Sequence, residues 1–246
     1  MFEFKTRYLW LLFAVVFAVT FFTRANIRTV KEFNPATLQS PKQTPVQDRS
    51  VIRFKKNGYQ YEATPHFDYE INGLIVHALN YWFVIDRGER ISPTDVCMIW
   101  GDNLKNKVHQ SGVRFSQDGR WCYFQNFDPA TFRLDQVSNN HLLVQDDKLE
   151  ARIKKILPGD QVKIKGKLVA VKARLVGKGD LYDSREMTWS GSTKREDTGK
   201  GACEVILVED MQILRHANGL SRLLFQFSLI SLILLFLYEL FRILRP

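Results

Sequence analysis

Two uninterrupted apolar runs lie near the ends of the chain, with a longer segment of mixed polar and apolar residues between them. Neither residues 8–22 nor residues 223–238 contain a charged side chain. Because a charge is costly to bury in hydrocarbon, a charge-free run with basic ends is typical of a membrane-spanning helix. We therefore expect transmembrane helices over 8–23 and 223–240. The flanking basic residues are Lys5, Arg7, Arg24, Arg222 and Arg242.

Each run has an alternative interpretation. Basic residues followed by an apolar run also fit a cleaved signal peptide, but Phe21 and Phe22 stand where small residues should form the cleavage site. The second run also fits a buried core helix, yet it is apolar on all faces, which suits lipid better. The first run is short for a bilayer, which takes about 20 residues to span. We expect a two-helix hairpin anchor with both termini on one side of the membrane.

Composition divides the rest of the chain. Pro35, Pro41 and Pro45 interrupt a stretch rich in Gln, Thr, Ser and Lys, so we expect a flexible tether over 24–50. The remaining segments are a tail over 1–7, one folded domain over 51–214, a short junction over 215–222 and a tail over 241–246.

Alternation of apolar and polar residues predicts strands through most of the domain. Residues 51–55 and 59–63 alternate around Asn57-Gly58, a dipeptide favoured in the type I′ turn of a hairpin. Enrichment in aromatic and β-branched residues indicates the other strands. These cover residues 67–71, 74–76, 96–100, 121–125, 162–171 and 204–214.

Helical periodicity is confined to residues 128–132 and 146–157. The second helix should end at Pro158-Gly159, and the strand that follows contains Gly166. This phrase resembles the strand entry of an oligonucleotide- or oligosaccharide-binding (OB) barrel, in which a long strand bends at a glycine. We therefore expect a mostly β domain with one or two helices, placed between the two terminal anchors. Its strands should form a small barrel, OB-like in type, or a packed antiparallel sheet.

The chain is basic, with a formal net charge of +9. This surplus fits attraction to anionic lipid headgroups, binding of an acidic polymer, or a solvated surface without a charged partner. Lys163, Lys165 and Lys167 alternate and so share one face of their strand, which favours a binder of anionic polymers. The expected partners are the lipid bilayer and another membrane or envelope protein, and we do not expect nucleic acid.

The three cysteines are too few for a disulfide scaffold. Cys97 and Cys122 both lie in predicted strands, so they form a disulfide if these strands are neighbours in an oxidising compartment; otherwise they are buried thiols. No cluster of His and Cys has the spacing of metal ligands, so we expect neither a metal site nor a cofactor.

The third cysteine, Cys203, is a candidate nucleophile with His141 as its base. A thiolate needs a nearby proton acceptor or cation at neutral pH, and His141 or Arg195 can serve. The alternative is that Cys203 is a small core residue and that His141 only satisfies a hydrogen bond.

The segment before Cys203 combines hydroxyl groups, charges and glycines. One interpretation is an anion-binding pocket built around Lys194 and Arg195, although the spacing of a P-loop is absent. The other interpretation is structural, with Arg195, Asp197 and Thr198 bracing a turn.

Three motifs carry a resemblance to a known group of proteins. They are WGDN at 100–103, SNNHL at 138–142 and RxDTGxGACE at 195–204. Together they resemble a group of uncharacterised bacterial membrane-anchored proteins, over most of residues 66–214. The resemblance implies a bacterial source and an anchored domain, and it implies no activity.

The side of the membrane does not follow from charge, because basic residues are nearly balanced between the two flanks. An N-terminal anchor commonly exports the domain that follows it, so we expect an inner-membrane protein with a periplasmic domain. The preferred function is a binding or envelope-assembly module rather than an enzyme. The alternatives are a membrane-bound thiol hydrolase that uses Cys203 and His141, and a binder of anionic polymers.

Overall fold

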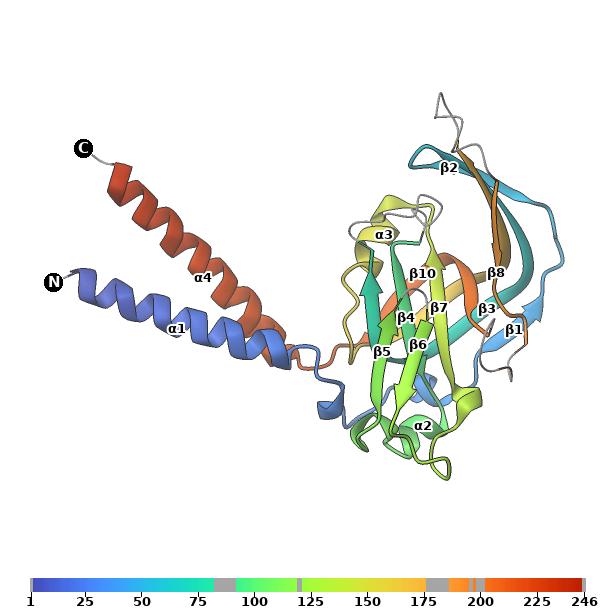
Figure 1. The fold of residues 1–246 in the computed structure, drawn as a ribbon, viewed down its shortest axis with the longest axis horizontal. Coiled ribbons are helices and arrows are strands. Elements are labelled where there is room, and N and C mark those ends of the chain that lie inside the picture. Colours follow the sequence, from blue (N-terminus) through green and yellow to red (C-terminus); the bar gives the residue numbers. More distant parts are fainter. Residues whose placement is uncertain are drawn as a thin grey trace.

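The fold is mostly sheet, with two long helices that project together from one side of the domain (Figure 1). It is described by a computed structural model that covers residues 2–81, 92–118, 121–175, 186–194, 197 and 202–244, with side chains from residue 6 onwards. Both termini lie at the far ends of the helices, away from the sheet (Figure 1).

One large sheet makes up the domain, and a separate hairpin packs beside it. The hairpin consists of β5 (Arg114–Asp118) and β6 (Trp121–Gln125). The strands of the large sheet are β1 (Lys42–Pro45), β2 (Ile52–Lys56), β3 (Tyr59–Asn80), β4 (Thr94–Ile99), β7 (Val137–Leu143), β8 (Gln161–Leu175), β9 (Met187–Ser190) and β10 (Glu204–Arg215).

The strands close into a ring in the order β3-β4-β7-β10-β8, because β8 also pairs with β3. All neighbours in the ring are antiparallel except β7 and β10, which run parallel. Gly166 of β8 lies against the backbone of β10: a Cβ at this position would be 2.2 Å from the carbonyl oxygen of Leu207. The register shifts next to it, between Val208 and Asp210, so the glycine permits close contact at a bulge.

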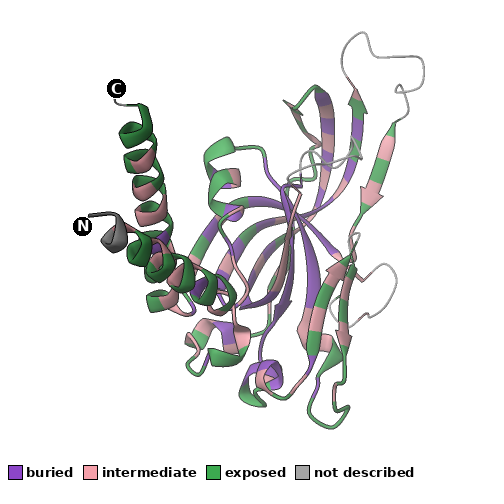
Figure 2. Ribbon diagram, turned by 60° about the vertical axis from the view of Figure 1, so that its left-hand side comes forward, coloured by how far each residue is buried: buried purple, intermediate pink, exposed green. Residues whose placement is uncertain are grey.

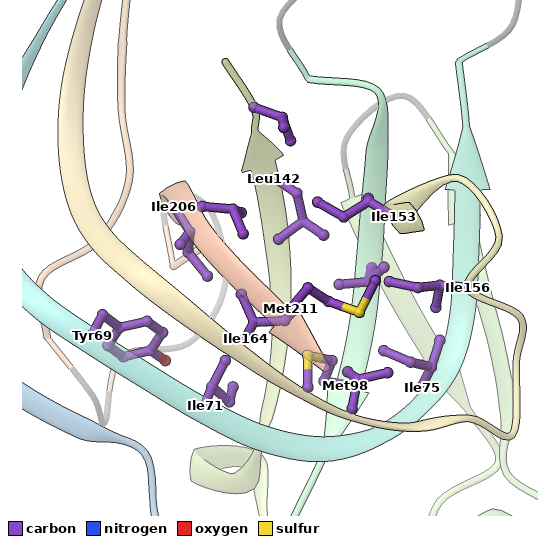
Figure 3. Packing of buried hydrophobic residues seen from close by; sticks show 14 of the residues in the cluster. Tyr69, Ile71, Ile75, Met98, Leu142, Ile153, Ile156, Ile164, Ile206 and Met211 are labelled. Atoms are coloured by element: carbon purple, nitrogen blue, oxygen red, sulfur yellow. The ribbon is translucent and has the colours of Figure 1, made fainter. Parts of the chain in front are cut away.

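The main core fills the inside of this ring. Apolar side chains from all five of its strands and from α3 (Asp147–Ile153) point toward one another (Figure 3). The ring strands are largely buried, whereas the terminal helices are largely exposed (Figure 2). The labelled residues of this core are Tyr69, Ile71, Ile75, Met98, Leu142, Ile153, Ile156, Ile164, Ile206 and Met211.

The local predictions from sequence agree with the structure at the first hairpin and at α3. Asn57 and Gly58 have φ angles of 51° and 84°, as a type I′ turn requires, and β2 pairs with β3 around them. Asp146 caps α3 by accepting a hydrogen bond from the Leu149 amide at 2.7 Å. Residues 128–132 form hydrogen-bonded turns rather than a helix, because the Asp128 carboxylate accepts from the Ala130 amide. A short helix that was not expected, α2 (Asp102–Lys105), follows β4.

Residues 24–50 differ from the flexible tether expected from their composition. They lie along the domain, and β1 pairs with β3 between Lys42 and Pro45. Thr37 is fully buried, and its carbonyl oxygen accepts from the Gly101 amide at 3.0 Å. The segment is ordered because its polar groups find partners on the domain, an outcome that composition does not reveal.

The terminal helices are α1 (Phe2–Thr23) and α4 (Gly219–Leu244). Both are long and apolar enough to cross a membrane, which gives weak support to a membrane protein. They pack against each other near the domain, where the rings of Phe17 and Phe225 stack 5.0 Å apart. Ser228 is buried in this contact region of α4, whereas Gln226 is exposed.

Candidate active site

Three neighbouring strands bring Asp95, His141 and Cys203 together. Asp95 of β4 lies directly opposite His141 of β7 in the antiparallel register. On the other side of β7, the parallel register pairs Glu204 of β10 with Asn140. Cys203 immediately precedes β10, so the ring places it beside Asn139 and His141 of β7. Residues more than 100 positions apart in the chain thus meet because β4, β7 and β10 are adjacent.

A buried carboxylate orients the histidine. His141 Nδ1 lies 2.8 Å from Asp95 Oδ2, and Asp95 is fully buried. The Tyr81 hydroxyl donates to Asp95 Oδ2 at 2.8 Å, and the Ser92 hydroxyl donates to Oδ1 at 3.1 Å. These two donors fix the position of the buried carboxylate and satisfy both of its oxygens.

The histidine also forms a hydrogen bond with the side chain of Cys203. Burial lowers the pKa of His141, but the hydrogen bonds and negative charges of Asp95 and Cys203 outweigh it and raise the pKa to about 9. His141 is therefore an imidazolium at neutral pH. A cation next to a cysteine sulfur favours the thiolate, which is the nucleophilic form.

The side-chain amide of Asn139, two residues before His141 on β7, also contacts Cys203. Asn139 Nδ2 donates toward Cys203 Sγ at 3.7 Å. The orientation of this amide is set by Gln117 of β5, whose Nε2 donates to Asn139 Oδ1 at 2.5 Å. Gln117 is in turn bound through Oε1 to His77 Nδ1 at 3.2 Å. The Asn139 amide thus presents its NH₂ group, rather than its oxygen, to the sulfur.

The backbone of Cys203 is held by the segment after β9. The Ser192 amide donates to the Cys203 carbonyl oxygen at 2.8 Å. A Cβ at Gly191 would lie 2.7 Å from the same oxygen, so only glycine allows this approach. The Ser192 hydroxyl donates to the Asp197 carboxylate. Of the three residues predicted to brace a turn here, Asp197 is the one that the structure describes.

Cys203 lines an open pocket with a volume of about 280 Å³. Its described lining comes from β6, from residues 134–139 and from the segment before β10. In the described part of the sequence that separates α1 from α4, three large apolar side chains are exposed: Trp121, Tyr123 and Leu134. All three line this pocket. The complete described lining is Trp121, Cys122, Tyr123, Phe124, Leu134, Val137, Ser138, Asn139, Asp197, Ala202 and Cys203.

Cys97 and Cys122 are joined in a disulfide, with Cα atoms 5.8 Å apart. The bond links β4 to β6, and Cys122 also lines the pocket. Since the chain has three cysteines, Cys203 is its single free thiol.

The other residues predicted from sequence lie away from the pocket or outside the described residues. Lys194 is exposed, and Arg195 and Thr198 lie outside the described part of the chain. Lys163, Lys165 and Lys167 alternate on the outer face of β8. Carboxylates neutralise two of these lysines: Lys163 lies 2.9 Å from Glu70, and Lys167 lies 2.5 Å from Asp68.

Sequence reasoning missed Asp95, Asn139 and Gln117. Asp95 carried a signal, because it is the one ionisable residue in a strand whose other residues are apolar or small, TDVCMI at 94–99. Asn139 and Gln117 carried none, since their roles depend on which strands become neighbours.

Within the described ranges, no three His, Cys, Asp or Glu side chains are grouped so that they could hold a metal ion. No family model, curated protein or solved structure matches the chain. Any function must therefore be argued from the geometry of Asp95, His141 and Cys203.

Proposed function

We propose that the protein is a membrane-anchored thiol hydrolase that cleaves an acyl bond with Cys203 as nucleophile. The observation that carries this proposal is the buried chain from Asp95 through His141 to Cys203 at the wall of an open pocket. A nucleophile, its base and a third group that orients the base are the parts that covalent acyl transfer needs.

In this mechanism the Cys203 thiolate attacks the carbonyl carbon of an ester, thioester or amide. The Asn139 NH₂ group donates to the carbonyl oxygen as it becomes negative. The bond to the leaving group breaks while the His141 imidazolium gives that group its proton. Water then attacks the acyl thioester, neutral His141 accepts a proton from this water, and the acid leaves as the thiol is restored.

The main competitor is a binding or envelope-assembly module, the function preferred from sequence alone. The buried Asp95–His141 contact argues against that alternative, because burying such a polar pair seldom stabilises a fold more than apolar packing does. The pair also contacts the free thiol, and that thiol lines an open pocket. Both properties favour a catalytic role.

We place the domain on the exported side of the inner membrane and assign it an OB-like barrel. A disulfide is typical of oxidising compartments, and that between Cys97 and Cys122 supports a periplasmic location. The five-stranded ring, with α3 between β7 and β8, supports the OB-like assignment. A reporter fused after residue 31 that reads out as cytoplasmic would contradict the exported location.

The reactivity of Cys203 tests the enzyme proposal directly. Full-length protein in lipid nanodiscs is treated with iodoacetamide at pH 7, and labelling of the one free cysteine is followed by mass spectrometry. We expect alkylation at least tenfold faster than that of an ordinary exposed thiol, because about 97% of such a thiol is protonated at this pH. His141→Ala should remove this advantage. Labelling at the rate of an ordinary thiol in both proteins would refute the hydrolase.

A further inference from the structure

The apolar rim of the pocket identifies the chemical class of the group that enters it. The domain keeps its other described large apolar side chains at least partly covered, yet it exposes Trp121, Tyr123 and Leu134 to 37%, 47% and 41% around one opening. Exposed apolar side chains that gather at a single concave site mark a place where an apolar ligand is bound.

Three polar side chains in the described lining already have partners, and one of them, Ser138, accepts from the Asn140 side chain at 2.9 Å. Asn139 is bound to Gln117 and directed toward Cys203, and Asp197 accepts from Ser192. A site for an extended peptide presents many backbone partners, whereas this wall is built mainly from ring and aliphatic carbon. The single carboxylate of Asp197 also disfavours an anionic group at this end of the pocket.

We propose that the pocket binds the apolar chain of an acyl group, so that the substrates are acyl esters or thioesters with a long hydrocarbon chain. This inference rests on the proposed thiol hydrolase. In the bound state the carbonyl carbon lies at Cys203, and the hydrocarbon contacts the wall that β6 and Leu134 provide. The terminal helices hold the domain beside a bilayer, where acyl chains are abundant.

Chloromethyl ketones test the chain-binding wall without requiring turnover. Each reagent places a carbonyl next to a CH₂Cl carbon; the thiolate attacks this carbon, a C–S bond forms and chloride leaves. Full-length protein in nanodiscs is compared with a methyl ketone, chloroacetone, and with its hexyl counterpart, 1-chloro-2-octanone. We expect the hexyl ketone to label Cys203 at least tenfold faster, because each fully buried methylene contributes a gain of roughly three- to fourfold.

Variants separate binding by the pocket from partition into lipid. Trp121→Ala and Leu134→Ala should each reduce the hexyl-to-methyl ratio by about threefold or more. Because the ratio compares two reagents on the same protein, a change in the reactivity of Cys203 itself cancels. Gln125→Ala is the matched control, since this residue is exposed on the same strand and does not line the pocket. Partition into lipid is equal for all these proteins, so it cancels in the comparison.

The outcomes distinguish this inference from the function on which it rests. Fast iodoacetamide labelling without preference for the hexyl ketone, or a preference that both pocket variants retain, would overturn the acyl-chain site and leave the hydrolase standing. A phenylalanyl chloromethyl ketone that labels faster than the hexyl ketone would assign the pocket to peptides instead. Slow labelling by every reagent would overturn both proposals.

Discussion

At the scale of single residues, the pKa of His141 determines when the proposed enzyme works. The charge of Asp95 and the contact with Cys203 raise this pKa to about 9, so the imidazolium that protonates the leaving group is lost above that pH. Hydrolysis of an acyl thioester should therefore fall along an alkaline limb near pH 9. Asp95→Asn removes the charge that raises the pKa, so the limb should move toward the ordinary value of about 6.5.

The measurement is the pH profile of acyl-thioester hydrolysis in the wild type and in Asp95→Asn. At pH 8 we expect the variant to react at least tenfold more slowly, and to recover part of its rate as the pH falls toward 6. Asp102→Asn is the control, because that carboxylate is half exposed and pairs with Lys105 on α2. A limb that stays near pH 9 in Asp95→Asn would show that Asp95 does not set the pKa.

The same pKa makes stability depend on pH with a definite sign. The folded-state pKa of His141, about 9, is higher than the unfolded value of about 6.5. Its contribution to the free energy of unfolding is therefore complete below about pH 6.5 and is lost as the pH rises through 9. The wild type should lose more of its thermal stability than Asp95→Asn between pH 6.5 and 9, which calorimetry can measure. An equal loss in both proteins would contradict the coupling.

Single residues also show how far the sequence predicts the site. Cys203 and His141 were recognisable because each stands in an unusual local context. Their partner Asp95 was not assigned, because its role requires β4 and β7 to pair in one register, and a shift of one residue would turn its side chain to the other face. Local patterns thus single out candidate residues, and long-range pairing decides which of them meet.

At the scale of elements, the β5–β6 hairpin depends on the disulfide. The hairpin is a separate two-stranded sheet, and a lone hairpin of this kind is marginal in water. The bond from Cys122 to Cys97 of β4 closes a loop with a sequence separation of 25. The chain-entropy model gives about 3 kcal/mol for a loop of this size.

We predict that replacing both cysteines, Cys97→Ala with Cys122→Ala, lowers the free energy of unfolding by about 3 kcal/mol. The variant should also lose the preference for the hexyl ketone, because β6 forms the wall of the chain-binding pocket. Chemical denaturation and ketone labelling measure the two effects. Cys203→Ser, which keeps the disulfide, is the control for stability. If the double variant has the same free energy of unfolding as Cys203→Ser, the disulfide has no structural role.

Elements differ in how well sequence patterns predict them. The Asn57-Gly58 hairpin and α3 follow from local turn and cap signals, and both are found. β3, in contrast, is one strand of 22 residues where shorter strands were expected. Asn72-Gly73 resembles a turn, but it pairs with β8 throughout, since the ring supplies partners on both sides. Tertiary pairing therefore overrides a local turn signal here.

At the scale of the whole molecule, a cluster of polar side chains around the buried Asp160 joins the terminal helices to the domain. Asp160, which precedes β8, is fully buried and lies 2.8 Å from Arg222 of α4 and 3.0 Å from His216. The segments that follow α1 and precede α4 are also hydrogen-bonded to each other, since the Thr29 hydroxyl donates to the Asn218 side chain at 2.5 Å. The expected flexible tether is thus replaced by a fixed attachment on both sides.

This attachment predicts that the domain and its anchors unfold together, and Asp160→Asn tests it. Removing one member of a buried ion pair costs about 3 to 5 kcal/mol, because Arg222 loses the charge that compensates its own. We expect a lower melting temperature in nanodiscs and faster proteolysis at the 215–219 junction. Glu62→Gln is the matched control: its pair with Arg53 is exposed, so removing it should leave the melting temperature nearly unchanged. If Asp160→Asn melts like Glu62→Gln and its junction stays protected, the cluster does not hold the domain to its anchors, and the pocket is then free to move relative to the bilayer.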